Sequence, residues 1–377
     1  MPAVPPIDFA SALRIAFAAI GLALVPLGWV WLRSRGADRR GRLAALTALA
    51  MFLCFDLIVF GAFTRLTDSG LGCPDWPGCY GEASPLGASE DIAAAEAAHP
   101  SGPVTWSKAW IEMIHRYLAM TVGLLIVVLA AASWAERDRL PHALGWPLAT
   151  LAWVVLQGLA GKYTVTMKLY PSVVTLHLLG GIGLLVLLAW QHEGYRDRPF
   201  ALSAGLHAGA AATAVLLLVQ IAPGGWVCAN YAVLACGGFP RCNGHWWPPM
   251  DFGQGFTLLR ELGRAGHGGY LELPALVAIH MAHRLVAIAA FAALVALAVA
   301  LVRRPRCRRY GGALGALALL QVATGLSNVV LGWPIVAAIL HSAGAAALVL
   351  ALALLLARAR RPDFGAERAA GARPLAA

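Results

Sequence analysis

The sequence predicts an all-α membrane protein that consists of two pseudo-symmetric four-helix transmembrane bundles, related as a parallel internal repeat, and one extra N-terminal transmembrane helix. Three observations predict this fold: the composition, a series of long apolar stretches, and motifs that recur along the chain. Of the 377 residues, 59% are hydrophobic and 13% are charged, whereas soluble domains average about 45–50% apolar and about 25% charged residues. This composition excludes a soluble multidomain enzyme, a disordered chain, a collagen and a small disulfide scaffold.

Nine stretches are long and apolar enough for transmembrane helices, because about 20 apolar residues cross the hydrocarbon core of a bilayer. They lie near residues 12–32, 43–63, 109–134, 146–166, 173–191, 201–222, 273–302, 312–332 and 335–357. None has the alternating polar pattern of a barrel strand. The first could be a signal peptide by its position, but it lacks a clear cleavage site and continues into arginine-rich sequence, so we retain it as a span.

The basic residues give the orientation of these helices. Most of the 29 lysines and arginines lie in one set of connections and in the C-terminal tail. The two long loops on the other side, about 64–108 and 223–272, hold few. By the positive-inside rule, the arginine-rich loops and the C-terminus are cytoplasmic and the long loops are periplasmic in a bacterial inner membrane. The net charge of +10 therefore reflects topology, and we expect no nucleic-acid partner.

Four of the seven cysteines form two matched pairs in the long loops: Cys73 with Cys79, and Cys236 with Cys242. Both pairs share the pattern C-x-x-aromatic-P-x-C-x-G. An oxidising compartment favours disulfides at these positions. The sequence leaves open whether the pairs are structural or redox-active, and it assigns no role to Cys228.

The same offset relates other segments, which indicates an internal repeat. Glu112-Met-Ile-His-Arg116 aligns with His280-Met-Ala-His-Arg284, and residues 156–177 align with residues 320–341 without a gap. Both halves begin on the same side of the membrane, which predicts parallel repeats. The predicted organisation is an N-terminal helix and basic loop (1–42), two four-helix halves (43–191 and 201–357) and a cytoplasmic tail (358–377).

Four histidines within the apolar stretches fall into two pairs under this repeat: His115 with His177, and His283 with His341. An ionisable residue inside a span is costly and marks a functional site. Two neutral imidazoles that face each other across a bundle suit a flat apolar cofactor whose iron needs two axial nitrogens, as in haem. A lone histidine would more often serve an interhelical hydrogen bond, and zinc or copper would favour carboxylate or thiolate ligands. The recurrence of the pairs favours two haem sites.

The halves differ at Glu112, which precedes His115 by one turn where the second half has His280. A carboxylic acid beside a haem could move protons during oxygen chemistry, although its position near the helix end also allows simple solvation. This asymmetry suggests that one half is catalytic and that the other holds a cofactor. The cations Arg65, Arg116 and Arg284, with Lys162 and Lys168, are candidates to bind haem propionates, and ordinary snorkelling is the alternative.

Residues Phe60–Gly70, the Glu112-x-x-His-Arg segment, His283-Arg284 and His341 resemble the heme A synthase family, and the resemblance extends over about residues 43–357. It implies an eight-helix core of two halves. It also implies an enzyme that oxidises the C8 methyl group of haem O to a formyl group, giving haem A for terminal oxidases. The extra N-terminal helix departs from this pattern.

The resemblance also implies a role for each half. The substrate haem O would lie between His115 and His177 beside the catalytic acid Glu112. A haem b would lie between His283 and His341. Cys73 and Cys79 match the outer-loop pair of the family, which is implicated in activity or haem handling.

Two other functions remain as alternatives: a di-haem electron carrier of the quinol-linked cytochrome b type, and a haem transporter or chaperone. A carrier would place its haems at different depths, and a transporter would not explain Glu112. The expected partners are membrane lipid, an enzyme that supplies haem O, and an electron donor. The sequence does not identify the donor or the oligomeric state, and a homo-oligomer stays open.

Overall fold

The computed structural model describes residues 9–139, 145–196, 198–266 and 268–360. Each of the nine predicted stretches coincides with a helix and extends past the ends of that helix by no more than three residues, which confirms the all-α class. Their bounds are α1 Phe9–Arg33, α2 Arg39–Leu66, α4 Trp106–Ala135, α5 Gly145–Thr166, α6 Pro171–Arg196, α7 Ala204–Ala229, α9 Leu273–Val302, α10 Arg308–Val330 and α11 Ile335–Arg358. Residues 1–8 of the predicted N-terminal segment and residues 361–377 of the predicted tail lie outside the described residues.

Within the described residues, eight helices are long and apolar enough to cross a membrane. The ninth predicted span, α5, is a helix of 22 residues but falls outside this group, because polar residues such as Gln157 and Lys162 interrupt its apolar sequence. It packs against α4 and α6. Trp153 of α5 donates a hydrogen bond to the carbonyl of Gly180 on α6 at 2.8 Å. One polar group of α5 is therefore hydrogen-bonded to a neighbouring helix.

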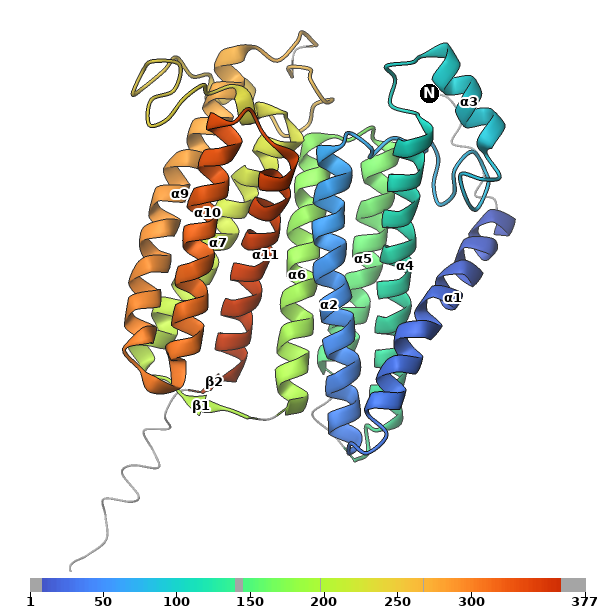
Figure 1. Cartoon of the computed structure of the whole chain (residues 1–377), viewed down its shortest axis with the longest axis vertical. Coiled ribbons are helices and arrows are strands. Elements are labelled where there is room, and N and C mark those ends of the chain that lie inside the picture. Colours follow the sequence, from blue (N-terminus) through green and yellow to red (C-terminus); the bar gives the residue numbers. More distant parts are fainter. Residues whose placement is uncertain (1–8, 140–144, 197, 267, 361–377) are drawn as a thin grey trace, which may run out of the picture.

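The long helices stand side by side along one direction, except α1, which is tilted away from the others (Figure 1). Helices α2, α4, α5 and α6 contact one another in sequence order, and α2 also packs against α6; α7, α9, α10 and α11 make the corresponding contacts. The two groups meet where α11 packs against α2 and α6 and where α6 packs against α7. Helix α1 lies outside, against α4 and α2. Close van der Waals packing holds such helices together, since lipid is as apolar as their side chains.

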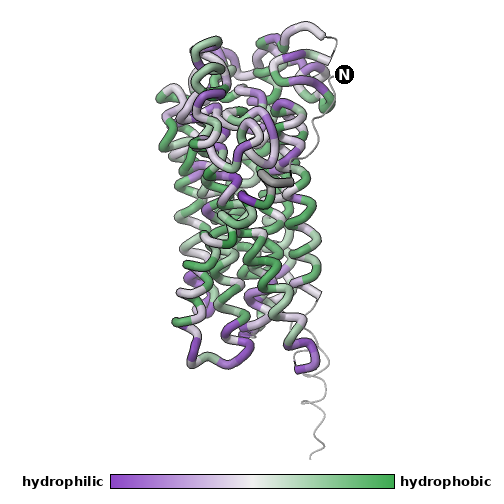
Figure 2. Tube along the Cα trace, turned by 90° about the vertical axis from the view of Figure 1, so that its right-hand side faces the viewer, coloured by the Kyte–Doolittle hydropathy of each residue, from purple (hydrophilic) through white to green (hydrophobic). Residues whose placement is uncertain are grey.

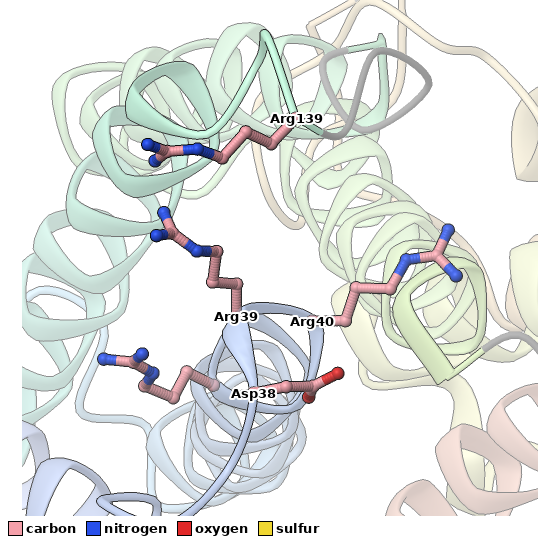
Figure 3. Close-up of a pocket in the computed structure, with 5 residues that line it drawn as sticks. Asp38, Arg39, Arg40 and Arg139 are labelled. Atoms are coloured by element: carbon pink, nitrogen blue, oxygen red, sulfur yellow. The ribbon is translucent and has the colours of Figure 1, made fainter.

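Polar residues gather at both ends of the helices and apolar residues between them (Figure 2). At the arginine-rich end, β1 (Phe200–Ala201) and β2 (Ala359–Arg360) form a short parallel pair. A pocket of about 400 Å³ opens at this end, between Asp38, Arg39 and Arg139 among others (Figure 3). Arg39 of this pocket donates to Glu136 at 2.6 Å; this hydrogen bond is the main reason why the pKa of Glu136 is lowered.

The long loops lie at the opposite end and contain short helices that the sequence did not predict: α3 (Ser89–Ala98), η2 (Ala232–Leu234) and α8 (Phe252–Gly255). The predicted cysteine pairs are confirmed as disulfides. Cys73 bonds to Cys79 with a Cα–Cα distance of 4.8 Å, and Cys236 bonds to Cys242 with a distance of 4.7 Å. Each disulfide packs against the first turns of the following long helix, α4 or α9.

Candidate active site

The histidines of the second helix group face each other. His283 lies on α9 and His341 on α11, and their ring centroids are 6.4 Å apart with an interplanar angle of 77°. A first-row metal bound at about 2 Å by one nitrogen of each ring would place the ring centres about 6 Å apart. The observed separation therefore fits two axial ligands of one iron.

The composition of this site favours an iron that is already held by a macrocycle. Two imidazoles are too few for a protein zinc site, which needs three or four ligands, but they complete the coordination of haem iron. Among residues 9–139, 145–196, 198–266 and 268–360, no group of three or more histidine, cysteine, aspartate or glutamate side chains could hold a bare metal ion.

The first helix group carries His115 on α4 and His177 on α6. His115 stacks on Phe60 of α2, with ring centroids 6.4 Å apart and planes at 13°. His177 has a buried Nδ1 atom without a hydrogen-bond partner. A buried polar atom without a partner is costly, and no described side chain holds this nitrogen in place.

Each of the four histidines lies against a glycine on a neighbouring helix. A Cβ atom built on Gly61 would lie 3.0 Å from Nε2 of His115, and one built on Gly161 would lie 3.3 Å from Cε1 of His177. In the second group, a Cβ on Gly224 would lie 2.9 Å from Cε1 of His283, and one on Gly325 would lie 3.2 Å from Cε1 of His341. The missing side chains leave room for the rings between closely packed helices.

Gly224 gives a direct test of this packing. We expect Gly224→Ala to push the His283 ring out of place, because the added methyl group would overlap the ring, and to reduce the haem bound by the purified protein several-fold. Gly209→Ala on the same helix is the matched control, since its Cβ would meet nothing within 4 Å. Absorbance spectra at equal protein concentration measure the difference, and equal haem content in the two variants would contradict the expectation.

Glu112 is buried, with 4% of its surface exposed, so the helix-end solvation that the sequence allowed does not occur. Its carboxylate forms an ion pair with Arg116, one turn further along α4. Its Oε2 atom also accepts a hydrogen bond from the Cys73 backbone N–H at 2.8 Å. Glu112 is thus connected to the disulfide loop, and His280 takes the matching place in the second half, with its Nδ1 2.9 Å from the carbonyl oxygen of Ala232.

The two predicted propionate ligands Arg116 and Arg284 hold the disulfide loops. Arg116 donates to the carbonyl oxygens of Cys73, Asp75, Pro77 and Gly78. Arg284 donates to those of Cys236, at 3.2 Å, and Gly238, at 3.0 Å. These carbonyl groups occupy guanidinium N–H donors of the two arginines that the sequence suggested as candidates to bind propionates. A buried Nη1 atom of Arg284 has no partner, so this arginine keeps a donor for a ligand.

Arg116→Ala should therefore destabilise the protein more than Arg284→Ala. The first variant leaves the buried Glu112 without its cation, which costs about 3–5 kcal/mol, whereas the second loses hydrogen bonds worth about 1–3 kcal/mol. Thermal unfolding and the rate of proteolysis within the loops measure the effect. Arg241→Ala is the control, because this exposed arginine stacks on Trp246 in the second loop. The opposite order of stability would contradict the expectation.

Arg65, the third predicted propionate ligand, reaches from the end of α2 to the second helix group. Its guanidinium lies 4.0 Å from the centre of the Tyr231 ring, and it donates to the Tyr231 hydroxyl at 2.5 Å and to the carbonyl of Ala229 at 3.2 Å. The Tyr231 hydroxyl donates in turn to Asp68. Burial is the main reason why the pKa of Tyr231 is raised, which keeps its hydroxyl protonated. Arg65 thus connects the two groups of helices at the end where the histidines lie.

The fold and the site define a class of protein: a multi-pass helical membrane protein with paired, partly buried histidines beside disulfide-closed loops. The COX15-CtaA family model, described as cytochrome oxidase assembly protein, matches residues 44–353. Heme A synthase of Shewanella oneidensis is 37% identical over 310 residues, which cover 81% of this chain and 93% of the relative. Heme A synthase of Methylobacterium radiotolerans is 30% identical over 369 residues, covering 90% of this chain and 96% of the relative. Heme A synthase of Caulobacter vibrioides is 28% identical over 351 residues, covering 86% and 98%.

The chain belongs to this family of cytochrome oxidase assembly proteins, the heme A synthases. The predicted resemblance is confirmed, and with it the assignment of the protein as an oxidoreductase enzyme.

Proposed function

We propose that the protein oxidises the C8 methyl group of haem O to a formyl group and so produces haem A for terminal oxidases. Membership of the family supports this reaction. The observation that carries the haem assignment is the 6.4 Å separation of the His283 and His341 rings, which suits two axial ligands of one iron.

We propose that the chain consists of two four-helix halves, residues 43–191 and 201–357, that repeat one architecture. The matching contacts within α2, α4, α5 and α6 and within α7, α9, α10 and α11 support this division. The four glycine–histidine contacts support it further, because they recur in both groups. Residues 1–42 would add a helix, and residues 358–377 would form a cytoplasmic tail.

In this proposal the first half holds the substrate haem O between His115 and His177, and the second half holds a haem b between His283 and His341. The iron supplies the oxidising chemistry when haem is bound. Glu112 lies on the same side of α4 as His115, three residues away. We place proton transfer at Oε2 of Glu112, because Arg116 engages Oε1; Oε2 accepts the Cys73 N–H and keeps a second lone pair for a proton. Arg116 orients the carboxylate, and the disulfide loop above it excludes water.

The cysteine-bearing loops would face the periplasm and the arginine-rich ends the cytoplasm of a bacterial inner membrane, in accordance with the positive-inside rule. The histidines lie on the loop side of the helices: His177 and His341 each lie about 9 Å from the start of their helix, and His115 and His283 about 14–15 Å. An enzyme that makes haem O would supply the substrate, and a separate donor would supply electrons.

Extraction of the haems from the purified protein tests the proposal. Chromatography with mass spectrometry should find haem b together with haem O, its hydroxylated form or haem A. Two equivalents of haem b alone would instead support a di-haem electron carrier, although placing all four histidines on one side of the membrane argues against transmembrane electron transfer. A protein without haem would overturn the proposal.

A further inference from the structure

The two histidine pairs differ in the side chains that contact their Nδ1 atoms. Thr324 of α10 lies with Oγ1 3.0 Å from Nδ1 of His341. The same hydroxyl donates its proton to the carbonyl of Leu320 at 2.7 Å. Because a hydroxyl has one proton to donate, its oxygen accepts from His341 Nδ1–H. This tautomer leaves Nε2 of His341 with a free lone pair for iron.

His283 has a comparable partner in Gln220 of α7. The amide nitrogen of Gln220 lies 2.9 Å from Nδ1 of His283, and its Oε1 atom is buried without a partner. The same amide nitrogen donates to the carbonyl oxygen of His283 at 3.2 Å. A half-turn of the amide exchanges the nitrogen and the oxygen, which have nearly the same shape, and gives up this longer hydrogen bond. Oε1 then accepts from Nδ1–H, which satisfies the buried oxygen and again leaves Nε2 for iron.

The first half has no such side chains at the corresponding positions. Leu57 precedes Gly61 by four residues, as Gln220 precedes Gly224, so Leu57 is the counterpart of Gln220 under the repeat. Ala160 directly precedes Gly161, as Thr324 directly precedes Gly325, so Ala160 is the counterpart of Thr324. Neither leucine nor alanine can hydrogen-bond an imidazole. Consistent with this, Nδ1 of His177 is buried and lacks a partner.

We infer that Gln220 and Thr324 are positioning residues that make the second site a permanent haem b site, and that their replacement by Leu57 and Ala160 makes the first site exchangeable. A hydrogen bond to the second nitrogen of a ligating histidine fixes the ring and raises its basicity, and its loss typically weakens metal binding about 10–100-fold. A site for a substrate must release its product, and an unrestrained imidazole can leave the iron more easily. This inference rests on the proposed function.

Exchange of the paired residues between the halves tests the inference. Thr324→Ala and Gln220→Leu should speed the transfer of haem b from the purified protein to excess apomyoglobin about 10-fold or more. They should also raise the reduction potential of the remaining haem b, because a less basic ligand stabilises the ferric iron less. Thr324→Ser keeps the hydroxyl and should restore both values.

Ser327→Ala is the matched control on the same helix, because this exposed hydroxyl donates its hydrogen bond to the carbonyl of Ala323; it should change neither value. The reverse change, Ala160→Thr, should slow the release of the haem held by the first half. Unchanged transfer rates and potentials in Thr324→Ala and Gln220→Leu would overturn the inference and leave the proposed function intact. Absence of haem b from the unaltered protein would overturn the proposed function itself.

Discussion

Glu112→Gln should abolish the conversion of haem O to haem A and leave haem bound at both histidine pairs. Glutamine keeps an oxygen that accepts the Cys73 N–H bond but cannot exchange a proton at the pH of the cell. Loss of a general acid or base typically lowers the rate about 10²–10⁴-fold. The ratio of haem A to haem O in cells that express the variant, with the total haem per purified protein, measures the effect.

The same substitution on an exposed carboxylate is the matched control. Glu90 lies on α3 in the same loop and faces solvent, so Glu90→Gln should keep full conversion. Because Glu112→Gln also removes the buried ion pair with Arg116, its thermal stability must be measured beside its haem content. A folded, haem-loaded Glu112→Gln variant that still forms haem A would remove Glu112 from the mechanism.

The helices and the disulfides of the described chain followed from local sequence patterns. Apolar length predicted every long helix, because a membrane span needs about 20 largely apolar residues. The spacing of Cys73 and Cys79, repeated at Cys236 and Cys242, predicted both disulfides. Helix α3 was missed because its ten residues are too short and too weakly amphipathic to stand out within a polar loop.

The contacts of the charged residues did not follow from local patterns. The sequence placed Glu112 near a helix end, where solvation was a reasonable expectation, but the disulfide loop folds over this end and buries it. It also named Arg116 and Arg284 as candidates to bind propionates, but it did not show that carbonyl groups of the same loops accept hydrogen bonds from them. Backbone carbonyls carry no sequence signature, so such contacts become visible only in three dimensions.

The side chains that contact the histidines could be predicted from the sequence only in part. The repeat matched Gly161 with Gly325 by sequence, but it gave no reason to select Gly224, Gln220 or Thr324. These residues stand out only after the packing of α7 against α9 and of α10 against α11 is known. Once the repeat offset is applied to them, the absence of polar side chains at Leu57 and Ala160 becomes informative.

Removal of a histidine from one pair should release only the haem of that half. His341→Ala should remove haem b and keep the haem held by the first half, because each pair lies within its own group of helices and each iron needs both axial ligands. His177→Ala should keep haem b and lose haem O and its oxidised products. Haem extracted from each variant, separated by chromatography and counted per protein, gives the result.

Rescue by added imidazole separates lost ligation from lost folding in these variants. Truncation of either histidine leaves a cavity beside Gly325 or Gly161, and free imidazole can occupy such a cavity and ligate the iron in place of the side chain. We expect imidazole to restore haem b to His341→Ala without changing the haem content of the unaltered protein. Loss of the same haem from both variants would contradict the assignment of one haem to each half, because it would mean that the four histidines serve one site.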